Sequence, residues 1–259
     1  MPQLPAVSLE RIAAWLEPDT GFAPITVVAE TGSTSVDLLA ALAKGEATAG
    51  AVLIAEHQSA GRGRFTREWV VTPGSSLTMS LVLEPGRPQA QWGWLSLLSG
   101  MAVAEAVRSL DPAQIARVEL KWPNDVLVDG RKVCGIIADG SGKYAVIGIG
   151  VNVGQDESEL PVPTATSLAL TGLPADKSLL AARILGALSR YFKRWQQTGD
   201  VRAEYMALSA TLGRKVRVIL SDTETVEGEA VGLDTDGSLL VAHDGTVSSF
   251  SAGDVVHLR

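Results

Sequence analysis

The chain has 259 residues, of which 46% are hydrophobic and 20% are charged, and its net charge is −7. These values are typical of a globular protein with a large core, built as one domain or as one large and one small domain. The acidic balance argues against a general nucleic-acid binder, whose surface is normally basic. Cys134 is the single cysteine, which excludes internal disulfides and cysteine-rich metal cages and predicts a buried thiol.

The beginning of the chain carries no recognisable targeting pattern. The first 25 residues lack the basic, apolar and small-residue regions of a signal peptide. No run of 18 apolar residues occurs, so no membrane span is expected. We therefore expect the protein in the cytoplasm.

Helical and strand-like patterns alternate through the first 210 residues. In chain order, apolar spacing predicts a helix over 8–16, a strand over 25–28, a helix over 36–44, strands over 51–55 and 77–83, a helix over 94–110, strands over 117–121, 126–128, 132–138 and 144–153, and a helix from 176 to about 197. The alternation over 76–83 predicts a strand with one face on the core. The hydroxyl-rich turn 31–35 precedes a helix, whose free N–H groups favour polar or anionic partners.

After Ala210 the chain changes to short strands separated by tight turns. The predicted strands cover 216–220, 225–233, 238–242, 246–250 and 255–258, with Asp-Gly turns at 236–237 and 244–245. Such a series is typical of a small SH3-like β-barrel. We predict an α+β fold, in which a domain over 1–210 has a mixed, mostly antiparallel sheet flanked by helices and a small SH3-like domain follows over 211–259.

The densest motif is Gly61-Arg62-Gly63-Arg64-Phe65-Thr66-Arg67-Glu68-Trp69, a basic stretch in an acidic chain. Arginine presents a fixed fork of donors that fits phosphate and carboxylate groups, and glycine lets the backbone approach a ligand closely. The stretch therefore predicts a loop that closes over an anion. A solvated basic loop is the alternative interpretation.

A second constellation is Lys121-Trp122-Pro123-Asn124-Asp125. Proline lacks an N–H and ends the strand, which leaves a lysine, an amide and a carboxylate exposed at the strand end. Lys132 follows the Asp129-Gly130 hairpin turn, and strand alternation could aim its side chain into the same cleft. The alternative interpretation is an ordinary turn with solvated charges.

The common nucleotide and nucleophile motifs are absent. Residues 140–143 lack the Ser or Thr and the first glycine of a P-loop, and residues 148–153 end in valine where a dinucleotide-binding fingerprint needs glycine. The three histidines match no zinc spacing, and no Gly-x-Ser-x-Gly elbow occurs. We therefore expect no covalent catalysis through serine or cysteine, and a nucleotide would have to bind by another design.

Several segments, taken together and in this order, make the chain resemble the biotin protein ligases, also called biotin–[acetyl-CoA carboxylase] ligases. The matching segments are residues 33–35, 55–64 with Arg67 and Trp69, 121–127, 130–136, 148–153 and 251–255. A single segment would be moderate evidence, but their common order is highly specific. The resemblance runs from the first predicted strand to the end of the chain.

The resemblance implies a catalytic domain like that of class II synthetases and a reaction in two steps. The biotin carboxylate attacks the α-phosphate of ATP, giving biotinyl-5′-AMP and pyrophosphate, and a lysine of a carrier protein then attacks the anhydride. The implied co-substrates are ATP with Mg²⁺ and biotin, and the implied partner is the biotin carboxyl carrier domain of an acyl-CoA carboxylase. The attacking groups belong to the substrates, so the enzyme positions them and stabilises charge. The resemblance fits a monomer or a homodimer.

The resemblance also implies roles for individual residues. The implied catalytic residues are Lys132, Arg62, Asp125 and Lys121. The implied biotin-binding residues are Ser33, Thr34, Ser35, Gln58, Gly61, Arg62, Gly63, Arg64, Lys132 and Gly135. The implied ATP-binding residues are Arg64, Arg67, Trp69, Lys121, Asn124, Lys132 and Asn152. Asp125 is expected either to hold Mg²⁺ or to orient the incoming lysine, and no other metal ligand is implied.

The chain departs from the family pattern in two positions. Ser35 stands where the family usually has asparagine, so its hydrogen bond to biotin has a shorter reach. Thr66 stands where the arginine loop often has glycine, which predicts a stiffer loop. About 25 residues precede the matching region, too few for the helix-turn-helix domain of family members that repress transcription, so we expect a ligase without DNA binding.

Two rival functions remain for comparison. A lipoate ligase or octanoyl transferase shares the fold type, but its Arg-Arg-x-x-Gly-Gly-Gly segment is absent from this chain. A non-catalytic binder would use the SH3-like domain for a protein partner or the arginine loop for RNA, although the acidic charge weighs against RNA. For the small domain, a role as a lid or packing unit is the expected one.

Overall fold

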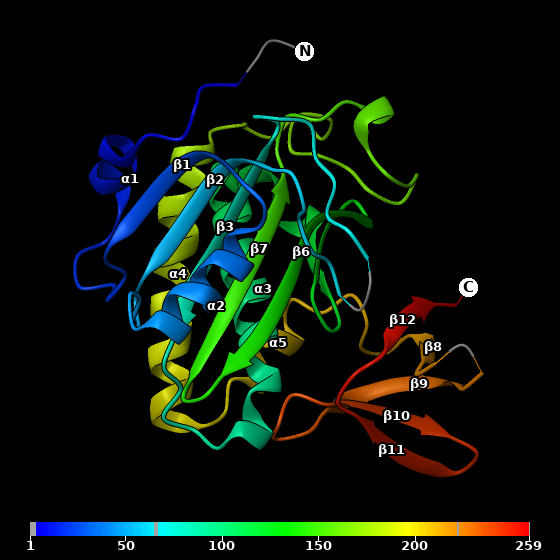
Figure 1. Ribbon diagram of the computed structural model, residues 1–259. Helices are drawn as coiled ribbons and strands as arrows, with labels where there is room; N and C mark the ends of the chain where they lie inside the picture. Colours follow the sequence, from blue (N-terminus) through cyan, green and yellow to red (C-terminus); the bar gives the residue numbers. More distant parts are fainter. Residues whose placement is uncertain (1–3, 65–66, 222, 259) are drawn as a thin grey trace.

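The computed structural model describes residues 4–64, 67–221 and 223–258, which form two β-sheets with helices around the larger one (Figure 1). The helices are α1 (Leu9–Trp15), α2 (Thr34–Lys44), α3 (Gly93–Leu110), α4 (Lys177–Thr198) and α5 (Arg202–Met206). The large sheet contains β1 (Ile25–Thr31), β2 (Val52–Gln58), β3 (Ser76–Leu83), β4 (Val118–Lys121), β5 (Asp125–Val128), β6 (Arg131–Ser141) and β7 (Tyr144–Asn152). The small sheet contains β8 (Lys215–Ile219), β9 (Thr225–Leu233), β10 (Leu239–His243), β11 (Thr246–Phe250) and β12 (Asp254–His257).

The large sheet is mixed and mostly antiparallel, as predicted. Its strand order is β1-β2-β3-β7-β6-β5-β4, and β1 and β2 form its one parallel pair. β3 and β7 pair from Ser76 opposite Asn152 to Leu83 opposite Ala145, while Ala55 of β2 lies opposite Thr78. This register brings the ends of β2 and β7 to the start of β3. Residues far apart in the chain therefore meet where these three neighbouring strands end or begin.

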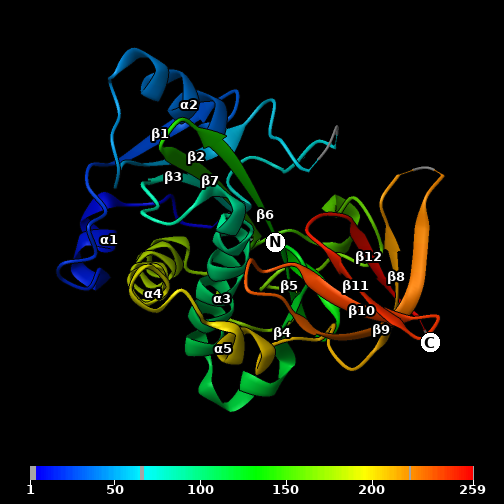
Figure 2. The ribbon, with the colours of Figure 1, turned by 90° about the horizontal axis from the view of Figure 1, so that it is seen from below.

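Helices cover the two faces of the large sheet unequally. α3 and α4 pack against each other on one face, and α2 lies on the opposite face over β2, β3 and β7 (Figures 1 and 2). α3 is buried along most of its length, in keeping with its almost continuous apolar sequence. Because α2 is short, part of the second face stays uncovered over β6 and β7, where the cavity described below opens.

The strand β3 differs from its prediction. The expectation that only one face of this strand is buried is wrong, since all eight of its residues are buried. Its hydroxyl groups are satisfied inside the protein, where Thr78 Oγ1 donates to Ala55 O at 2.7 Å and Ser80 Oγ bonds Thr34 Oγ1 at 2.7 Å. Thr78 and Ser80 therefore face α2 and the cavity instead of bulk solvent.

The small sheet has the order β11-β10-β9-β8-β12 and is held to the main domain through two tryptophans. Trp94 Nε1 donates to Thr235 O at 2.9 Å, and Trp122 Nε1 donates to Gly237 O at 3.1 Å. Residues 208–210 also bond the outer edge of β4, on both sides of Leu120. These contacts place the small sheet beside β4 and β5, and we propose the boundary between the two domains at residues 210–211.

Most other elements lie within three residues of their predicted bounds. α2 begins at Thr34, two residues earlier than predicted, and Gly45 ends it in the left-handed conformation. α5 and three short 3₁₀ helices are not predicted by the sequence patterns. Cys134 is buried, as expected. Across the described ranges, the longest helices fall short of the length and apolarity that a bilayer crossing requires.

Candidate functional site

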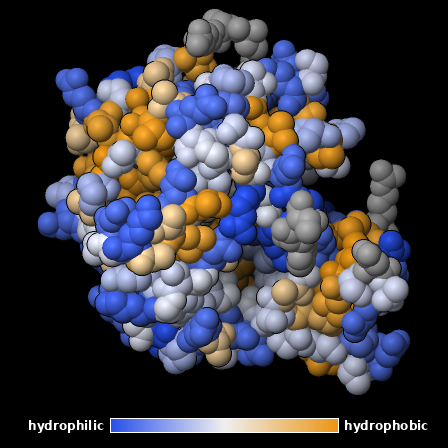
Figure 3. All heavy atoms as spheres, in the orientation of Figure 1, coloured by the Kyte–Doolittle hydropathy of each residue, from blue (hydrophilic) through white to orange (hydrophobic). Residues whose placement is uncertain are grey.

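A cavity of about 550 Å³ opens on the uncovered face of the large sheet, beside the small β domain. Its volume lies within the range of sites that enclose small organic ligands. Figure 3 shows this side of the molecule hollowed between the main and the small domain, with both hydrophilic and hydrophobic residues beside the hollow. The walls come from the start of α2, the ends of β2 and β4, the first half of β6, the second half of β7, residues 62–64 and 67–70, and β12.

The end of the cavity nearest α2 is a hydroxyl pocket formed by Ser33, Thr34, Ser35, Gln58 and Ser80. Gln58 Oε1 accepts hydrogen bonds from Thr34 N at 2.8 Å and from Thr34 Oγ1 at 2.9 Å. Ser80 Oγ lies 2.7 Å from Thr34 Oγ1 and 2.8 Å from Ser35 Oγ. Since its oxygen is engaged, the Gln58 amide keeps its Nε2 donor for a ligand. The pocket thus offers fixed, neutral polar groups.

Glycines of β6 and β7 form the floor of the cavity. Gly135 and Gly150 are paired across the two strands, and the Trp69 indole lies on both of them. A Cβ atom on Gly150 would fall 2.5 Å from Trp69 Cε2, and one on Gly148 would fall 2.5 Å from Ser35 Oγ. Glycine is therefore required where an indole and a hydroxyl approach the backbone, which explains the Gly-x-Gly pattern without a dinucleotide-binding fold.

Residues 61–64 and 67–69, here called the arginine segment, form one rim of the cavity. An antiparallel bridge between Arg62 and Glu68 closes the base of the segment, and Gly63 N donates to Arg67 O at 2.8 Å. Arg62 Nη1 reaches Asp139 Oδ2 at 3.4 Å on the outer side. The expected stiffening by Thr66 concerns a residue outside the described ones.

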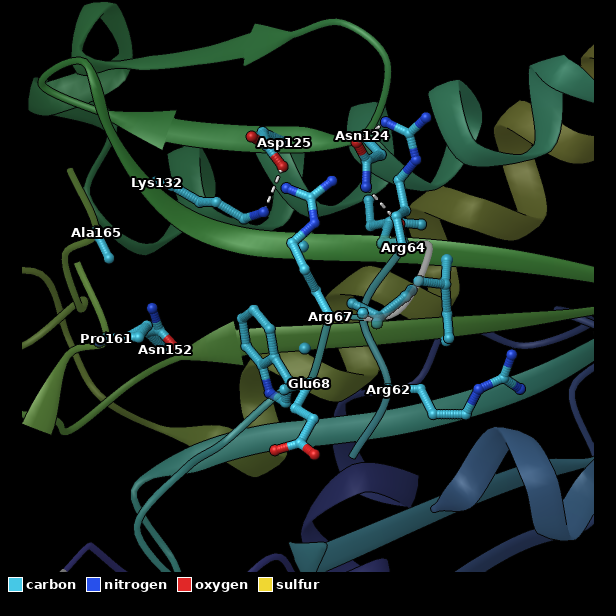
Figure 4. A pocket seen from close by; sticks show the side chains of 18 of the residues that line it. Arg62, Arg64, Arg67, Glu68, Asn124, Asp125, Lys132, Asn152, Pro161 and Ala165 are labelled. Carbon is cyan, nitrogen blue, oxygen red and sulfur yellow. Dashed lines mark hydrogen bonds and ion pairs between the residues drawn. The ribbon is translucent and has the colours of Figure 1, made fainter. Parts of the chain in front are cut away.

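Arg64 and Arg67 connect the arginine segment to the small domain. Arg67 Nη2 donates to both carboxylate oxygens of Asp254, at 2.9 and 2.8 Å. Arg64 Nη1 lies 3.5 Å from Asp254 Oδ1 and donates to Asn124 Oδ1 and Gly253 O, each at 3.2 Å. Figure 4 shows Arg64 beside Asn124. The carboxylate of Asp254 therefore occupies two guanidinium groups that face the cavity.

Lys132 and Asp125 face each other from neighbouring strands, with Lys132 Nζ 2.6 Å from Asp125 Oδ1 (Figure 4). The backbone of Lys132 is fixed on its outer side, because its N–H donates to Thr164 O and its carbonyl accepts from Thr166 N, both at 2.8 Å. Lys121 lines the same cavity one strand away. This arrangement confirms that the hairpin directs Lys132 into the cleft at the end of β4.

The far end of the cavity is closed by Asn152 and residues 161–165. Asn152 Nδ2 donates to Thr166 O at 3.0 Å, and its Oδ1 accepts from Gln155 Nε2 at 3.2 Å. The loop is held to the start of β6 by Arg131, which pairs with both oxygens of Glu157 at 2.9 Å. This end of the cavity therefore combines the Asn152 amide with the apolar side chains of Pro161, Val162 and Ala165.

Burial alters the acidity of several groups near the cavity. It lowers the pKa of Arg64, an effect that the nearby Asp254 partly offsets, but a guanidinium stays charged at neutral pH. Burial raises the pKa of the Cys134 thiol, so this thiol stays protonated and is no nucleophile. Burial, with the charges of Lys121 and Arg214, lowers the pKa of His257 to about 4. His257 is therefore neutral under physiological conditions.

The structure brings together almost all of the residues that the sequence singles out. The cavity is lined by Ser33, Thr34, Ser35, Gln58, Arg62, Gly63, Arg64, Arg67, Trp69, Lys121, Asn124, Asp125, Lys132, Gly135 and Asn152. Gly61 lies outside this lining and packs against the Trp69 backbone.

The sequence patterns did not predict that four further features belong to the site. These are Ser80, Gly150, Asp254 and residues 161–165. The signal for Ser80 is the presence of polar residues within β3. A strand that is buried on both faces usually has an unbroken apolar sequence, so polar residues in such a strand indicate a polar site. Asp254 lies in a segment that matched the family, but its approach to the cavity depends on how the small domain packs. Residues 161–165 carry no motif that would place them there.

The described part of the chain, residues 4–64, 67–221 and 223–258, contains no group of three or more His, Cys, Asp or Glu side chains arranged to hold a metal ion. Asp125 and Asn124 are nevertheless an oxygen-bearing pair at the cavity wall. Such a pair suits a Mg²⁺ ion that keeps most of its ligands from water and phosphate.

Comparison with solved structures relates this fold to ligand-bound enzymes. A biotin protein ligase from Aquifex aeolicus, solved in complex with biotin and ATP, superimposes with a TM-score of 0.76 and 26% identity, over 92% of this chain and 100% of that one. The ligase from Leishmania major in complex with biotinyl-5-AMP gives a TM-score of 0.64 and 26% identity, over 89% of this chain and 99% of that one.

Comparison with sequences agrees. Residues 28–156 match the Biotin/lipoate A/B protein ligase family, and residues 211–258 match the Biotin protein ligase C terminal domain. The chain is 43% identical to the biotin–[acetyl-CoA-carboxylase] ligase of Mycobacterium tuberculosis, over 93% of this chain and 91% of that protein. It is 33% identical to the bifunctional ligase/repressor BirA of Escherichia coli, over 82% of this chain and 67% of that protein. The chain therefore belongs to the biotin protein ligase family.

Proposed function

We propose that the cavity condenses biotin with ATP and then transfers the biotinyl group to a lysine of a biotin carboxyl carrier domain in an acyl-CoA carboxylase. The observation that carries this proposal is the contrast between the two sides of one cavity. A neutral hydroxyl pocket surrounds Gln58, whereas Arg64, Arg67 and Lys132 present cations. The ureido ring of biotin suits the first side, and the carboxylate and phosphates suit the second.

In the first step, the hydroxyl pocket holds the ureido ring and directs the biotin carboxylate toward Lys132. The Lys132 ammonium lies in partly buried surroundings, where it can donate both to this carboxylate and to the bridging oxygen of the α-phosphate. A carboxylate oxygen attacks the α-phosphorus, and pyrophosphate leaves with the electron pair of the broken P–O bond. Charge that builds up on the phosphate oxygens is stabilised by donors that are already in place.

The nucleotide takes the opposite part of the cavity. The Trp69 indole, fixed on Gly135 and Gly150, gives adenine an apolar face, and Asn152 offers amide groups at its edge. Arg64 and Arg67 bind the phosphates in exchange for Asp254. Lys121 and Asn124 contact the phosphate chain. Asp125 or Asn124 would be the protein ligand of a Mg²⁺ ion, which would neutralise phosphate charge.

In the second step, the neutral amine of the carrier lysine attacks the acyl carbon of biotinyl-5′-AMP, and AMP leaves with the electrons of the broken C–O bond. The anhydride must be kept from water until the carrier arrives. The arginine segment, with Arg62 on its outer side, covers the intermediate. Asp125, whose side chain is 18% exposed, either orients the incoming lysine or binds Mg²⁺.

Purified protein mixed with biotin, ATP and Mg²⁺ tests this function. We expect pyrophosphate release that depends on biotin, followed by label transfer to a lysine when a carrier domain is added. Lipoate in place of biotin should neither support release nor compete with labelled biotin. Absence of pyrophosphate across a range of pH and salt would overturn the proposal.

A further inference from the structure

A buried ion pair lies behind the cavity and takes no part in the reaction proposed above. The Lys177 side chain is 1% exposed, and its Nζ lies 2.5 Å from Glu56 Oε2. The same ammonium donates to the Gly74 carbonyl at 3.0 Å. Glu56, Gly74 and Lys177 do not line the cavity.

Stability alone gives little reason for a lysine at this position. Removing two charges from water is costly, and well-packed apolar residues of similar volume often stabilise a core equally well. Lys177 is also the first residue of α4, where the helix dipole disfavours a cation. A role in fixing geometry accounts better for the pair, because its bonds are directional and reach several parts of the chain.

The pair holds residues 4–8, here called the N-terminal strap, against the main domain. Glu56 Oε1 accepts a hydrogen bond from Val7 N at 2.5 Å, and Ser8 N donates to Ser178 Oγ at 3.0 Å. At its other end the strap packs on Gly154, where a Cβ atom would lie 2.7 Å from Leu4 Cδ1.

Besides α4, the segments that meet the pair or the strap continue into the cavity wall. Glu56 precedes Gln58 by two residues on β2, and the two side chains tie this short stretch of strand to Lys177 of α4 and to Thr34 of α2. Gly74 N donates to Glu56 O at 3.1 Å, and the next residue, Ser75, accepts from Gly154 N at 2.7 Å. The pair is thus joined to the ends of β2 and β7 and to the start of β3, all of which carry residues that line the cavity.

We propose that the Glu56–Lys177 pair and the N-terminal strap position Gln58, and that they thereby set the affinity for biotin. Lys177 is a positioning residue, since it acts through β2 and does not touch the substrate. A shift of the β2 end moves the Gln58 amide relative to Thr34 and Ser80, which define the hydroxyl pocket. This inference rests on the proposed function, because it takes the hydroxyl pocket to be the biotin site.

Biotin binding by titration calorimetry, together with steady-state kinetics, tests the proposal. Lys177→Met removes the ammonium at nearly constant length, and we expect Kd and KM for biotin to rise about tenfold, as for other indirect supporting contacts, while KM for ATP stays within about twofold. The double variant Glu56→Gln/Lys177→Met leaves no unpaired buried charge, so it should regain thermal stability but keep the weak biotin binding. Arg11→Ala, which breaks the exposed Arg11–Asp176 pair beside the strap, should change neither constant.

The outcomes separate this proposal from the function on which it rests. Wild-type protein that binds no biotin overturns both. Wild-type protein that binds biotin, with unchanged Kd in the double variant, overturns the positioning role alone. An equal rise of KM for biotin and for ATP also contradicts it, because general loosening would affect both ends of the cavity.

Discussion

Individual side chains determine how charge is distributed in the cavity. Lys132 and Asp125 form a close pair at the wall, whereas Gln58 is engaged only with neutral groups. An anionic substrate can replace Asp125 at Lys132 without moving the lysine backbone. The N–H and the carbonyl of Lys132 are both hydrogen-bonded, to the backbone of residues 164 and 166. The reacting carboxylate of biotin would therefore meet a Lys132 ammonium that is already oriented toward it.

Replacing Lys132 by methionine tests that donor. We expect Lys132→Met to lower biotin-dependent pyrophosphate release about 10²–10³-fold at saturating substrates, as the loss of a transition-state donor typically does. Lys143→Met is the matched control, because Lys143 pairs with Glu84 at the surface, and its rate should equal that of the wild type. A Lys132→Met rate within a few-fold of wild type would contradict the role.

The contact between Trp69 and Gly150 allows a test of the adenine platform by the addition of a single methyl group. A methyl group at Gly150 would lie 2.5 Å from Trp69 Cε2, so Gly150→Ala must displace the indole. We expect a shifted tryptophan emission and a KM for ATP raised about tenfold. Gly232→Ala is the control, since its Cβ would meet only Leu240 Cδ1 at 3.8 Å. Unchanged emission and KM in Gly150→Ala would refute this adenine platform.

Among the elements of the fold, the arginine segment links the catalytic cavity to the small domain. Arg67 and Arg64 contact Asp254 on β12, while Arg62 contacts Asp139 on β6. The segment is therefore closed against both domains through exchangeable ion pairs. Such pairs are weak where they are solvent-exposed, which allows a phosphate group to displace the carboxylates.

Removing one of these contacts tests the covering role of the segment. Arg62→Gly should keep the fold and form the adenylate, but release it into solution faster. Retention of labelled biotinyl-5′-AMP through a desalting column measures this, with Arg62→Lys as the variant that keeps the charge. Wild-type retention by Arg62→Gly would refute the covering role.

Local patterns predicted most helices and strands, but they misjudged β3. Ser76, Thr78 and Ser80 suggested a solvent face, whereas Thr78 and Ser80 line the cavity and Ser76 is buried against Gln155. Alternation with a period of two indicates that the two faces of a strand differ in polarity, but it does not indicate what covers each face. The start of α2 was placed too late for a similar reason, because Thr34 and Ser35 are poor helix formers whose side chains bond Gln58 and Ser80 instead.

Across the whole molecule, the junction of the two domains contains a histidine that links their stability to pH. His257 Nε2 lies 3.1 Å from Thr211 Oγ1, and that oxygen also accepts from Trp122 N at 3.1 Å. The Thr211 hydroxyl can donate to an unprotonated Nε2 or accept from a protonated one. Burial and the charges of Lys121 and Arg214 lower the pKa of His257 from 6.5 to about 4.

This shift predicts that the protein loses stability in mild acid. Between pH 6.5 and about 4 the unfolded state binds a proton at His257 that the folded state does not, so the free energy of unfolding falls as pH is lowered and the loss levels off below about 4. Melting temperatures between pH 4 and 7.5 should show a smaller decline for His257→Gln than for the wild type. Equal declines would exclude His257 as the cause.

The site as a whole was only partly predictable. Motifs at 61–69, 121–125 and 132 identified the charged residues, because each motif carries its chemistry within a few positions. The contributions of Ser80, Asp254 and residues 161–165 arise from sheet register and domain packing, which couple residues more than thirty positions apart. The Lys177–Glu56 pair belongs to the same class, since its members are 121 positions apart in the sequence.

The central claim is that this cavity activates biotin as its adenylate before any carrier lysine takes part. Exchange of labelled pyrophosphate into ATP measures that step directly, since it requires reversible formation of biotinyl-5′-AMP. We predict exchange that requires both biotin and Mg²⁺ and proceeds without a carrier domain, and that is lost in Lys132→Met. Exchange that is absent, or that proceeds equally well without biotin, would contradict the account.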